Sequence, residues 1–467
     1  MNLHRLHKGF SATLLVSLAL SACAGPTVQV AQVPTVPPPA SWRTDAGPVA
    51  PIDGEWWRSF GDPILTGLVE QALANNADLG IAMGRVREAR ANVDLARSQL
   101  LPSIDASLAG GGSRSVNPFG QAVEQYAAQP QVQTAWEIDL FGRLADQQAA
   151  ARDNWFASQA ARDAARLSIA SATASTYITL RALDARLEVA KATLAARAES
   201  LRIAHSRVDN GYSPRLELNQ AQAEYDATAQ IVPQIALGIT RAENALSTLI
   251  GNTPRDIERG TPFAALREPP VPEGLPSTLL TRRPDIAQAE LTLAAADKSL
   301  SVARKRFLPQ LRLTGSAGAA ISSLLADPIT IWSIGGSILA PIFEGGRLRA
   351  GAEVSGAQRD QAAFAYRRAV LNGFREVEDA LASAKRLDEQ LTLAIHQRDT
   401  LAEALRLATN RFREGYSPFL EQLDAQRGLL AAELSLIQIR TDALNARVQL
   451  YQAMGGGWSR SAIEGLE

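Results

Sequence analysis

Apolar residues recur at a seven-residue interval over long stretches of the chain. The positions are Leu180, Leu187, Leu194, Leu201 and Val208 in the first half, and Leu387, Leu391, Ala394, Leu401, Leu405, Ala408 and Phe412 in the second. This is the 3.5-residue period of supercoiled helices. A helix over residues 142–210 would be on the order of 100 Å long, longer than a globular domain accommodates. Ordinary amphipathic core helices are the alternative interpretation.

Four shorter segments alternate apolar and polar residues with a period of two. Their apolar positions are Ile104, Ala106 and Leu108; Val132, Thr134, Trp136, Ile138 and Leu140; Leu311 and Leu313; and Trp332, Ile334 and Ile338. Such two-faced segments suit transmembrane strands beside a wet lumen, although two soluble hairpins would alternate in the same way. Because an open sheet edge in lipid leaves backbone groups unpaired, several chains would have to share one barrel. Two chains make a lumen too narrow for cargo, so three are expected.

The two halves of the chain repeat each other. Gly211-Tyr212-Ser213-Pro214 recurs as Gly415-Tyr416-Ser417-Pro418 at an offset of 204, whereas Leu101-Pro102 recurs as Leu308-Pro309 at an offset of 207. Ordered matches over such a length indicate a duplication. Each half predicts a helix, two strands, a very long helix, a turn and another helix. The first helical stretch should run from Asp62 to about Leu101.

The N-terminus predicts export and lipidation. Met1–Ala22 combines basic residues, an apolar stretch and small residues, as a secretory signal does. Leu20-Ser21-Ala22-Cys23 looks like a bacterial lipobox, whose acylated cysteine would hold the chain on a membrane; an ordinary signal with a chance cysteine is the alternative. We divide the chain into a signal peptide (1–22), a lipidated N-terminus and extended tether (23–61), a first repeat (62–251), a proline-rich linker (252–281), a second repeat (282–455) and a C-terminal tail (456–467).

Composition excludes several classes of function. The balance of 47 basic against 48 acidic residues gives no reason to expect nucleic acid as a partner. Beyond the signal peptide the only histidines are His205 and His396, each single on a predicted helix. A histidine metal site or a nucleophile–histidine relay is therefore not expected. We predict no enzyme activity, no cofactor and no bound metal.

A series of motifs spread along the chain carries a family resemblance. They are the lipobox, GEWWRSFGDP at 54–63, WEIDLFGR at 136–143, LLTRRPDI at 279–286, PIFEGG at 341–346 and LDAQR at 423–427. In this order they resemble the TolC-like outer-membrane efflux channels, most closely their lipoprotein branch of the OprM and NodT type. The match covers nearly the whole chain, and the order of the motifs is more specific than any one of them.

The resemblance implies a mainly α-helical fold with a small membrane β part. A homotrimer would form a long coiled α-helical barrel, and its four strands per chain would close as a shared twelve-stranded barrel. The protein would be lipid-anchored and integral in the outer membrane and extend into the periplasm. It would be the passive exit duct of a tripartite multidrug efflux system, coupled by a periplasmic adaptor protein to an inner-membrane RND-type transporter. The alternatives are the exit duct of a protein secretion system and a lipid-anchored periplasmic coiled-coil scaffold without a pore.

The resemblance also assigns residues to a gate at the periplasmic tip. Leu420 and Asp424, four apart on one helix face, match the leucine and aspartate rings that narrow the family's closed aperture; a seam residue and a first-turn charge are the plainer interpretations. Asp209 and Arg413 are the expected locking ion pair, and Phe412 stands where some relatives have a gate tyrosine. The two turns are the expected tip and adaptor contact: Gly211, Tyr212, Ser213 and Pro214, with Gly415, Tyr416, Ser417 and Pro418.

Overall fold

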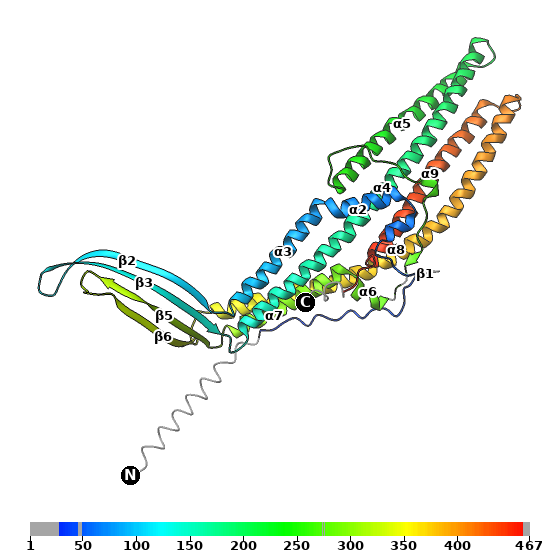
Figure 1. Ribbon diagram of the computed structural model, residues 1–467. Coiled ribbons are helices and arrows are strands. Elements are labelled where there is room, and N and C mark those ends of the chain that lie inside the picture. Colours follow the sequence, from blue (N-terminus) through cyan, green and yellow to red (C-terminus); the bar gives the residue numbers. More distant parts are fainter. Residues whose placement is uncertain (1–27, 45–48, 273, 275, 461–467) are drawn as a thin grey trace. The chain divides into compact units, whose positions relative to one another are not determined.

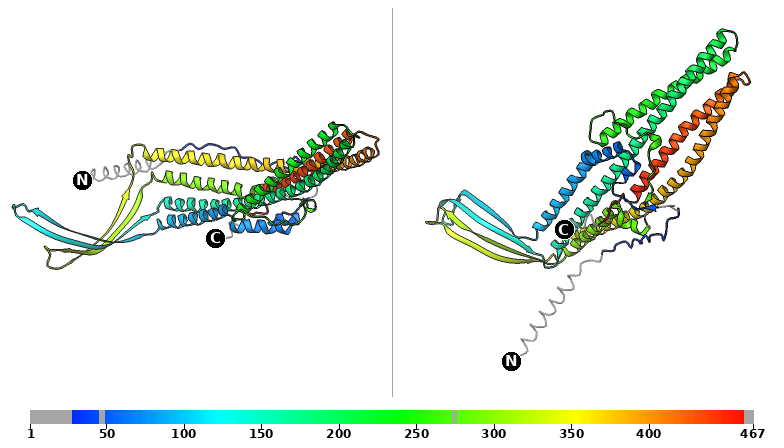
Figure 2. Two further views of the ribbon diagram at one scale, coloured as in Figure 1. Left: turned by 90° about the horizontal axis from the view of Figure 1, so that it is seen from above. Right: turned by 45° about the vertical axis from the view of Figure 1, so that its right-hand side comes forward.

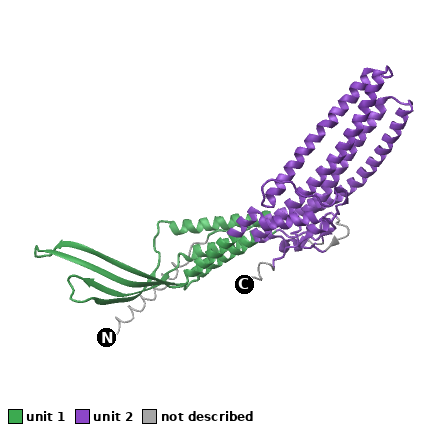
Figure 3. Cartoon of the chain, turned by 45° about the horizontal axis from the view of Figure 1, so that its top comes forward, with its two compact units in different colours: residues 1–35, 85–159, 288–368 green, residues 36–84, 160–287, 369–467 purple. Residues whose placement is uncertain are grey.

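The computed structural model describes residues 28–44, 49–272, 274 and 276–460. The signal peptide and Cys23 lie outside the described residues. The chain divides into two compact units, shown in Figure 3: unit one comprises 1–35, 85–159 and 288–368, and unit two comprises 36–84, 160–287 and 369–467. Within the described ranges, no helix carries an apolar stretch of the length that a membrane crossing requires.

Unit one contains an antiparallel sheet of four strands in the order β2-β3-β5-β6, seen in both views of Figure 2. The strands are β2 (Ser103–Val116), β3 (Ala122–Ile138), β5 (Gln310–Ser322) and β6 (Ile329–Leu339). Their register places apolar residues opposite each other, as for Trp136 and Leu313, and polar residues opposite each other, as for Glu137 and Arg312. The predicted strands and their two faces are thereby confirmed.

Two long helical hairpins contain most of the α-helical residues that the structure describes (Figure 1). The first is α4 (Arg143–Asp209) with α5 (Arg215–Leu249), and the second is α8 (Arg347–Arg413) with α9 (Phe419–Ala453). Helices α4 and α8 have 67 residues each and α5 and α9 have 35 each, with every boundary offset by 204. Helices α3 (Ala77–Ser98) and α7 (Pro284–Lys305) have 22 residues each, at an offset of 207. The duplication thus extends to the lengths of these three pairs of helices.

The helical stretch predicted from Asp62 to Leu101 is not one helix. Helix α2 (Pro63–Asn75) ends at Asn76, whose backbone is extended with ψ 131°. The Asn76 side-chain oxygen accepts hydrogen bonds from the N–H groups of Asp78 (2.9 Å) and Leu79 (3.3 Å) and so caps the start of α3. A capping asparagine inside an apolar periodicity therefore breaks the helix there.

The remaining elements are short. They are β1 (Val49–Ala50), which pairs in parallel with β4 (Val271–Pro272), the 3₁₀ helices η1 (Trp56–Phe60) and η2 (Phe263–Ala265), and α6 (Pro276–Arg282). Trp56 and Phe60 in η1 are fully buried in the core of unit two. The extended tether predicted for residues 23–61 therefore ends before this helix, because its aromatic side chains are large enough to join the core.

A buried carboxylate holds the linker between the repeats against the core of unit two. Asp62, which is buried, accepts hydrogen bonds from the Ile64 N–H (2.8 Å), the Tyr177 hydroxyl (3.0 Å) and the Thr261 N–H (2.9 Å). It thereby caps α2 while joining α4 to the linker. Each buried polar atom in this group has a partner, as a stable interior requires.

Candidate functional site

The two repeated turns close both hairpins with the same hydrogen bonds. In the first turn the Tyr212 N–H donates to the Arg207 carbonyl (2.8 Å) and the Gly211 N–H donates to the Val208 carbonyl (3.0 Å). This is the Schellman arrangement, which requires a left-handed residue after the helix; Gly211 has φ 78° and Gly415 has φ 79°. The second turn makes the equivalent bonds.

Prolines and exposed tyrosines complete these turns. Pro214 and Pro418 are the N-cap residues of α5 and α9, with nearly the same extended backbone. Tyr212 and Tyr416 extend into solvent, with 82% and 78% of their surface exposed. Each turn therefore presents an aromatic side chain beyond the ends of its two helices.

Helix α9 leaves the second turn with two different faces. Phe419 and Leu423 are buried, at 4% and 1% exposure, and pack against residues of the first hairpin. Leu420 is 49% exposed on a neighbouring face of the helix, where the Asp424 side chain is 63% exposed. The predicted aperture residues thus share one face of the helix, and that face is free to meet another molecule or the axis of an assembly.

A chain of charges connects Asp424 to the first hairpin. Its carboxylate lies 3.5 Å from Nη1 of Arg427, and Nε of Arg427 donates to Glu224 on α5 at 2.7 Å. The other oxygen of Glu224 lies 3.1 Å from Nη1 of Arg197 on α4, whose side chain is only 2% exposed. Burial lowers the pKa of Arg197, and Glu224 opposes that shift. The hydrogen bond to Glu224 raises the pKa of Arg427.

The residues predicted to lock the tip do not form an ion pair with each other in the described part of this chain. Asp209 and Arg413 are the last residues of α4 and α8, at equivalent positions of the two repeats. Oδ2 of Asp209 lies 3.3 Å from Nδ1 of His205. Among the described residues of this single chain, Asp209 and Arg413 do not pair, so their locking role stays a prediction for an assembly.

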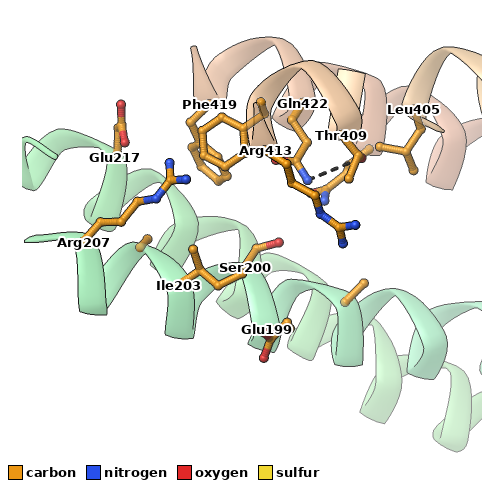
Figure 4. A pocket seen from close by; sticks show the side chains of 14 residues that line it. Glu199, Ser200, Ile203, Arg207, Glu217, Leu405, Thr409, Arg413, Phe419 and Gln422 are labelled. Carbon is orange, nitrogen blue, oxygen red and sulfur yellow. Dashed lines mark hydrogen bonds between the residues drawn. The ribbon is translucent and has the colours of Figure 1, made fainter. Parts of the chain in front are cut away.

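The aromatic ring of Phe412 forms a cation–π contact with an arginine of the first hairpin. The Arg207 guanidinium lies over its ring, with Cζ 4.5 Å from the centroid, and the Phe412 and Phe419 rings are 5.5 Å apart. Such a cation–π contact joins α4 to α8 without the hydroxyl that phenylalanine lacks. Figure 4 shows Arg207 and Arg413 at a cavity of about 310 Å³ between the two hairpins.

The sequence patterns did not predict an ion-paired group of Arg197, Glu224 and Arg427, although a comparison of the repeats distinguishes the first two. The positions equivalent to Arg197 and Glu224 in the second repeat hold Leu401 and Gly428. There the leucine side chain packs over the glycine, with a methyl carbon 3.4 Å from where a glycine Cβ would lie. Where two positions hold apolar residues in contact in one repeat and oppositely charged residues in the other, the two charged residues are expected to form a buried ion pair.

The exposed face of α9 carries the residues that the sequence predicts for a gate. The aperture face offers one apolar side chain and one carboxylate, and the charges behind it pair with each other. Within the described ranges, no group of histidine, cysteine, aspartate or glutamate side chains is arranged to hold a metal ion.

Comparison with known proteins places these features in context. The family described as "Outer membrane efflux protein" matches residues 68–252 and 275–456. The chain is 33% identical over 445 residues to the solvent efflux pump outer membrane protein SrpC of Pseudomonas putida, covering 92% of this chain and 95% of that protein. It is 30% identical over 454 residues to the cation efflux system protein CusC of Escherichia coli, covering 95% and 98%. The crystal structure of the Campylobacter jejuni CmeC outer membrane channel superposes with a TM-score of 0.85 at 26% identity, covering 94% of this chain and 96% of that one.

Proposed function

The chain belongs to the outer membrane efflux protein family, and from this premise we propose that it is the passive exit duct of a tripartite efflux system. It lies in the outer membrane, with its long helices extending into the periplasm. It carries out no reaction of its own: transport energy comes from an inner-membrane pump, for which we propose an RND-type transporter reached through a periplasmic adaptor. The relatives named for solvent and cation efflux support export of small solutes.

The two-faced sheet with open edges is the observation that carries this proposal. Strands β2 and β6 each have one neighbour within the chain, so each leaves a row of backbone groups unpaired. In lipid those groups cost several kcal/mol each unless another strand pairs with them. Three chains joined edge to edge would satisfy them and enclose a lumen wide enough for solutes.

We place the closed gate at the second turn. In a trimer the exposed face of α9 would turn toward the axis, where Leu420 side chains exclude water and Asp424 carboxylates attract cations. The exposed Tyr212 and Tyr416 at the turns would meet the adaptor, because aromatic side chains that project from rigid turns provide contact area at little entropic cost.

The proposal is tested by reconstituting the purified protein in planar bilayers. We expect discrete single-channel conductance, and analytical ultracentrifugation in detergent should give about three times the mass of the mature chain. A stable monomer that conducts would contradict the shared barrel. A trimer that never conducts, even when its gate is opened by substitution, would instead indicate a scaffold without a pore.

A further inference from the structure

A second cavity lies in unit one, where the sheet gives way to the helices. It has a volume of about 340 Å³ and is lined by residues at the starts of α4, β5 and α8, at the end of β6, and in the segments that follow α7 and β6. Its charged residues are Arg143, Arg306 and Arg347 against a single Glu344. Three guanidinium groups around one hollow provide the donors that phosphate and carboxylate groups bind most strongly.

The charges of this cavity are not fully compensated. Arg143 donates to Glu137 at 2.6 Å and Arg347 lies 2.6 Å from Glu344, but in the described part of the chain Arg306 has no ion-pair partner. In addition, Nε of Arg143 is buried and has no hydrogen-bond acceptor. A buried donor left unsatisfied calls for an acceptor from elsewhere.

The repeat shows that one acceptor has been removed here. In the first repeat, Asp139 caps α4 by accepting from the N–H groups of Leu144 (3.1 Å) and Ala145 (2.8 Å). The equivalent of Asp139 in the second repeat is Phe343, which is 88% exposed. Consequently, within the described ranges, the equivalent N–H groups of Leu348 and Arg349 have no acceptor. Leu348 itself lines the cavity, so these donors add to the arginines.

The sheet register assigns the cavity to the polar side. Gln310 and Leu339 both line it and face each other across β5 and β6. Arg312 is two residues beyond Gln310 on β5 and therefore lies on the same face of the sheet, and it is paired with Glu137 on β3. The cavity is therefore on the face that carries Glu137. The apolar face, which would meet lipid, is the other one. Because the cavity is on the face away from lipid, a lipid headgroup is not the ligand that we propose for it.

We propose that this cavity binds the phosphate or carboxylate groups of anionic solutes on their way through the duct. The assignment to solutes in a lumen rests on the proposed function, whereas the anion-binding chemistry rests on the arginines and the uncapped helix. Each chain would contribute one such site to the channel wall.

The test is equilibrium binding of inorganic pyrophosphate to the intact protein in detergent, measured by calorimetry at constant ionic strength. Arg306→Gln should weaken binding at least tenfold, because it removes a charge that makes no ion pair in the described chain. Phe343→Asp should abolish binding while keeping the fold, since the new carboxylate would cap α8 as Asp139 caps α4. Arg349→Gln is the matched control: its side chain pairs with Glu353 and does not line the cavity.

Unchanged pyrophosphate affinity in Arg306→Gln or Phe343→Asp, or no binding to the wild type, would overturn the site. Equal loss in the Arg349→Gln control would also overturn it, because it would reduce the effect to general surface charge. Binding is measured without conductance, so the two proposals fail separately. A protein that binds pyrophosphate but does not conduct contradicts the duct, and one that conducts but does not bind contradicts only the anion site.

Discussion

Replacing Glu224 by alanine tests the chain of charges that connects Asp424 to the first hairpin. Glu224 is the common partner of the buried Arg197 on α4 and of Arg427 on α9. Its removal leaves Arg197 buried and unpaired between the two hairpins. The same change releases Arg427, which is the only residue of this chain of charges that contacts Asp424.

The expected loss comes mainly from Arg197. Removing one partner of a buried ion pair costs about 3–5 kcal/mol, because the remaining charge stays in a poorly solvated site. With Glu224 itself 14% exposed, we expect the lower end of that range, about 3 kcal/mol per chain. The contact with Arg427 adds little, since that side chain is 52% exposed and exposed pairs contribute about 0–1 kcal/mol.

Denaturant unfolding followed by helical circular dichroism, at one protein concentration throughout, measures this effect. The control is the double variant Arg197→Leu/Glu224→Ala, which gives α4 the leucine that α8 has at Leu401. Without a buried charge it should fall within about 1 kcal/mol of the wild type. If the single and double variants are equally unstable, Glu224 acts through packing, and the argument from the buried charge is wrong.

Three further predictions concern other parts of the chain. Asp424→Ala should reduce the cation selectivity of the reconstituted channel, whereas Leu420→Ala should raise the resting conductance and leave the cation selectivity unchanged. Reversal potentials in a salt gradient separate these two effects. Unchanged selectivity in Asp424→Ala would show that this residue does not line the aperture. Cys23→Ser should fold but take up no palmitate in metabolic labelling, so equal label in variant and wild type would contradict the lipobox. Burial opposes ionisation of Asp146, but hydrogen bonds and charges led by Lys305 outweigh it and lower the Asp146 pKa. The stability that the Asp146–Lys305 pair contributes is fully present above the ordinary pKa of an aspartic acid, and it is lost as the pH falls through the lowered pKa of Asp146. Lys305→Met should therefore move the midpoint of acid unfolding to higher pH. An unchanged midpoint would contradict the stabilising role of this pair.

The features that sequence predicted are those that a periodic pattern determines. The heptad positions from Leu180 to Val208 lie on a single helix, because burial of a narrow apolar stripe requires the 3.5-residue period along its whole length. The alternation around Trp136 predicted a strand with two faces for the same kind of reason. Repeated Gly211 and Gly415 predicted turns, since few other residues adopt the left-handed backbone that follows each helix.

Features that depend on the contacts of a single side chain were not predicted. Asn76 ends a helix because its side chain caps the next one, and the apolar spacing continues through it. Trp56 joins the core although a proline-rich segment precedes it. The pairing of Arg427 on α9 with Glu224 on α5 depends on how these two helices pack, and no local pattern encodes that packing.

The places where the two repeats differ therefore carry more information than the places where they agree. Agreement gives two hairpins of equal length, which is what a tube built from several chains needs. Gln220 occupies the position of Asp424 in the first repeat, so in the proposed gate each chain would contribute one carboxylate instead of two. Halving the number of carboxylates lowers the repulsion among like charges that a narrow ring would otherwise contain. In the proposed trimer, a duplicated wall with an unduplicated gate would combine a uniform tube with a constriction whose charge is low enough to close.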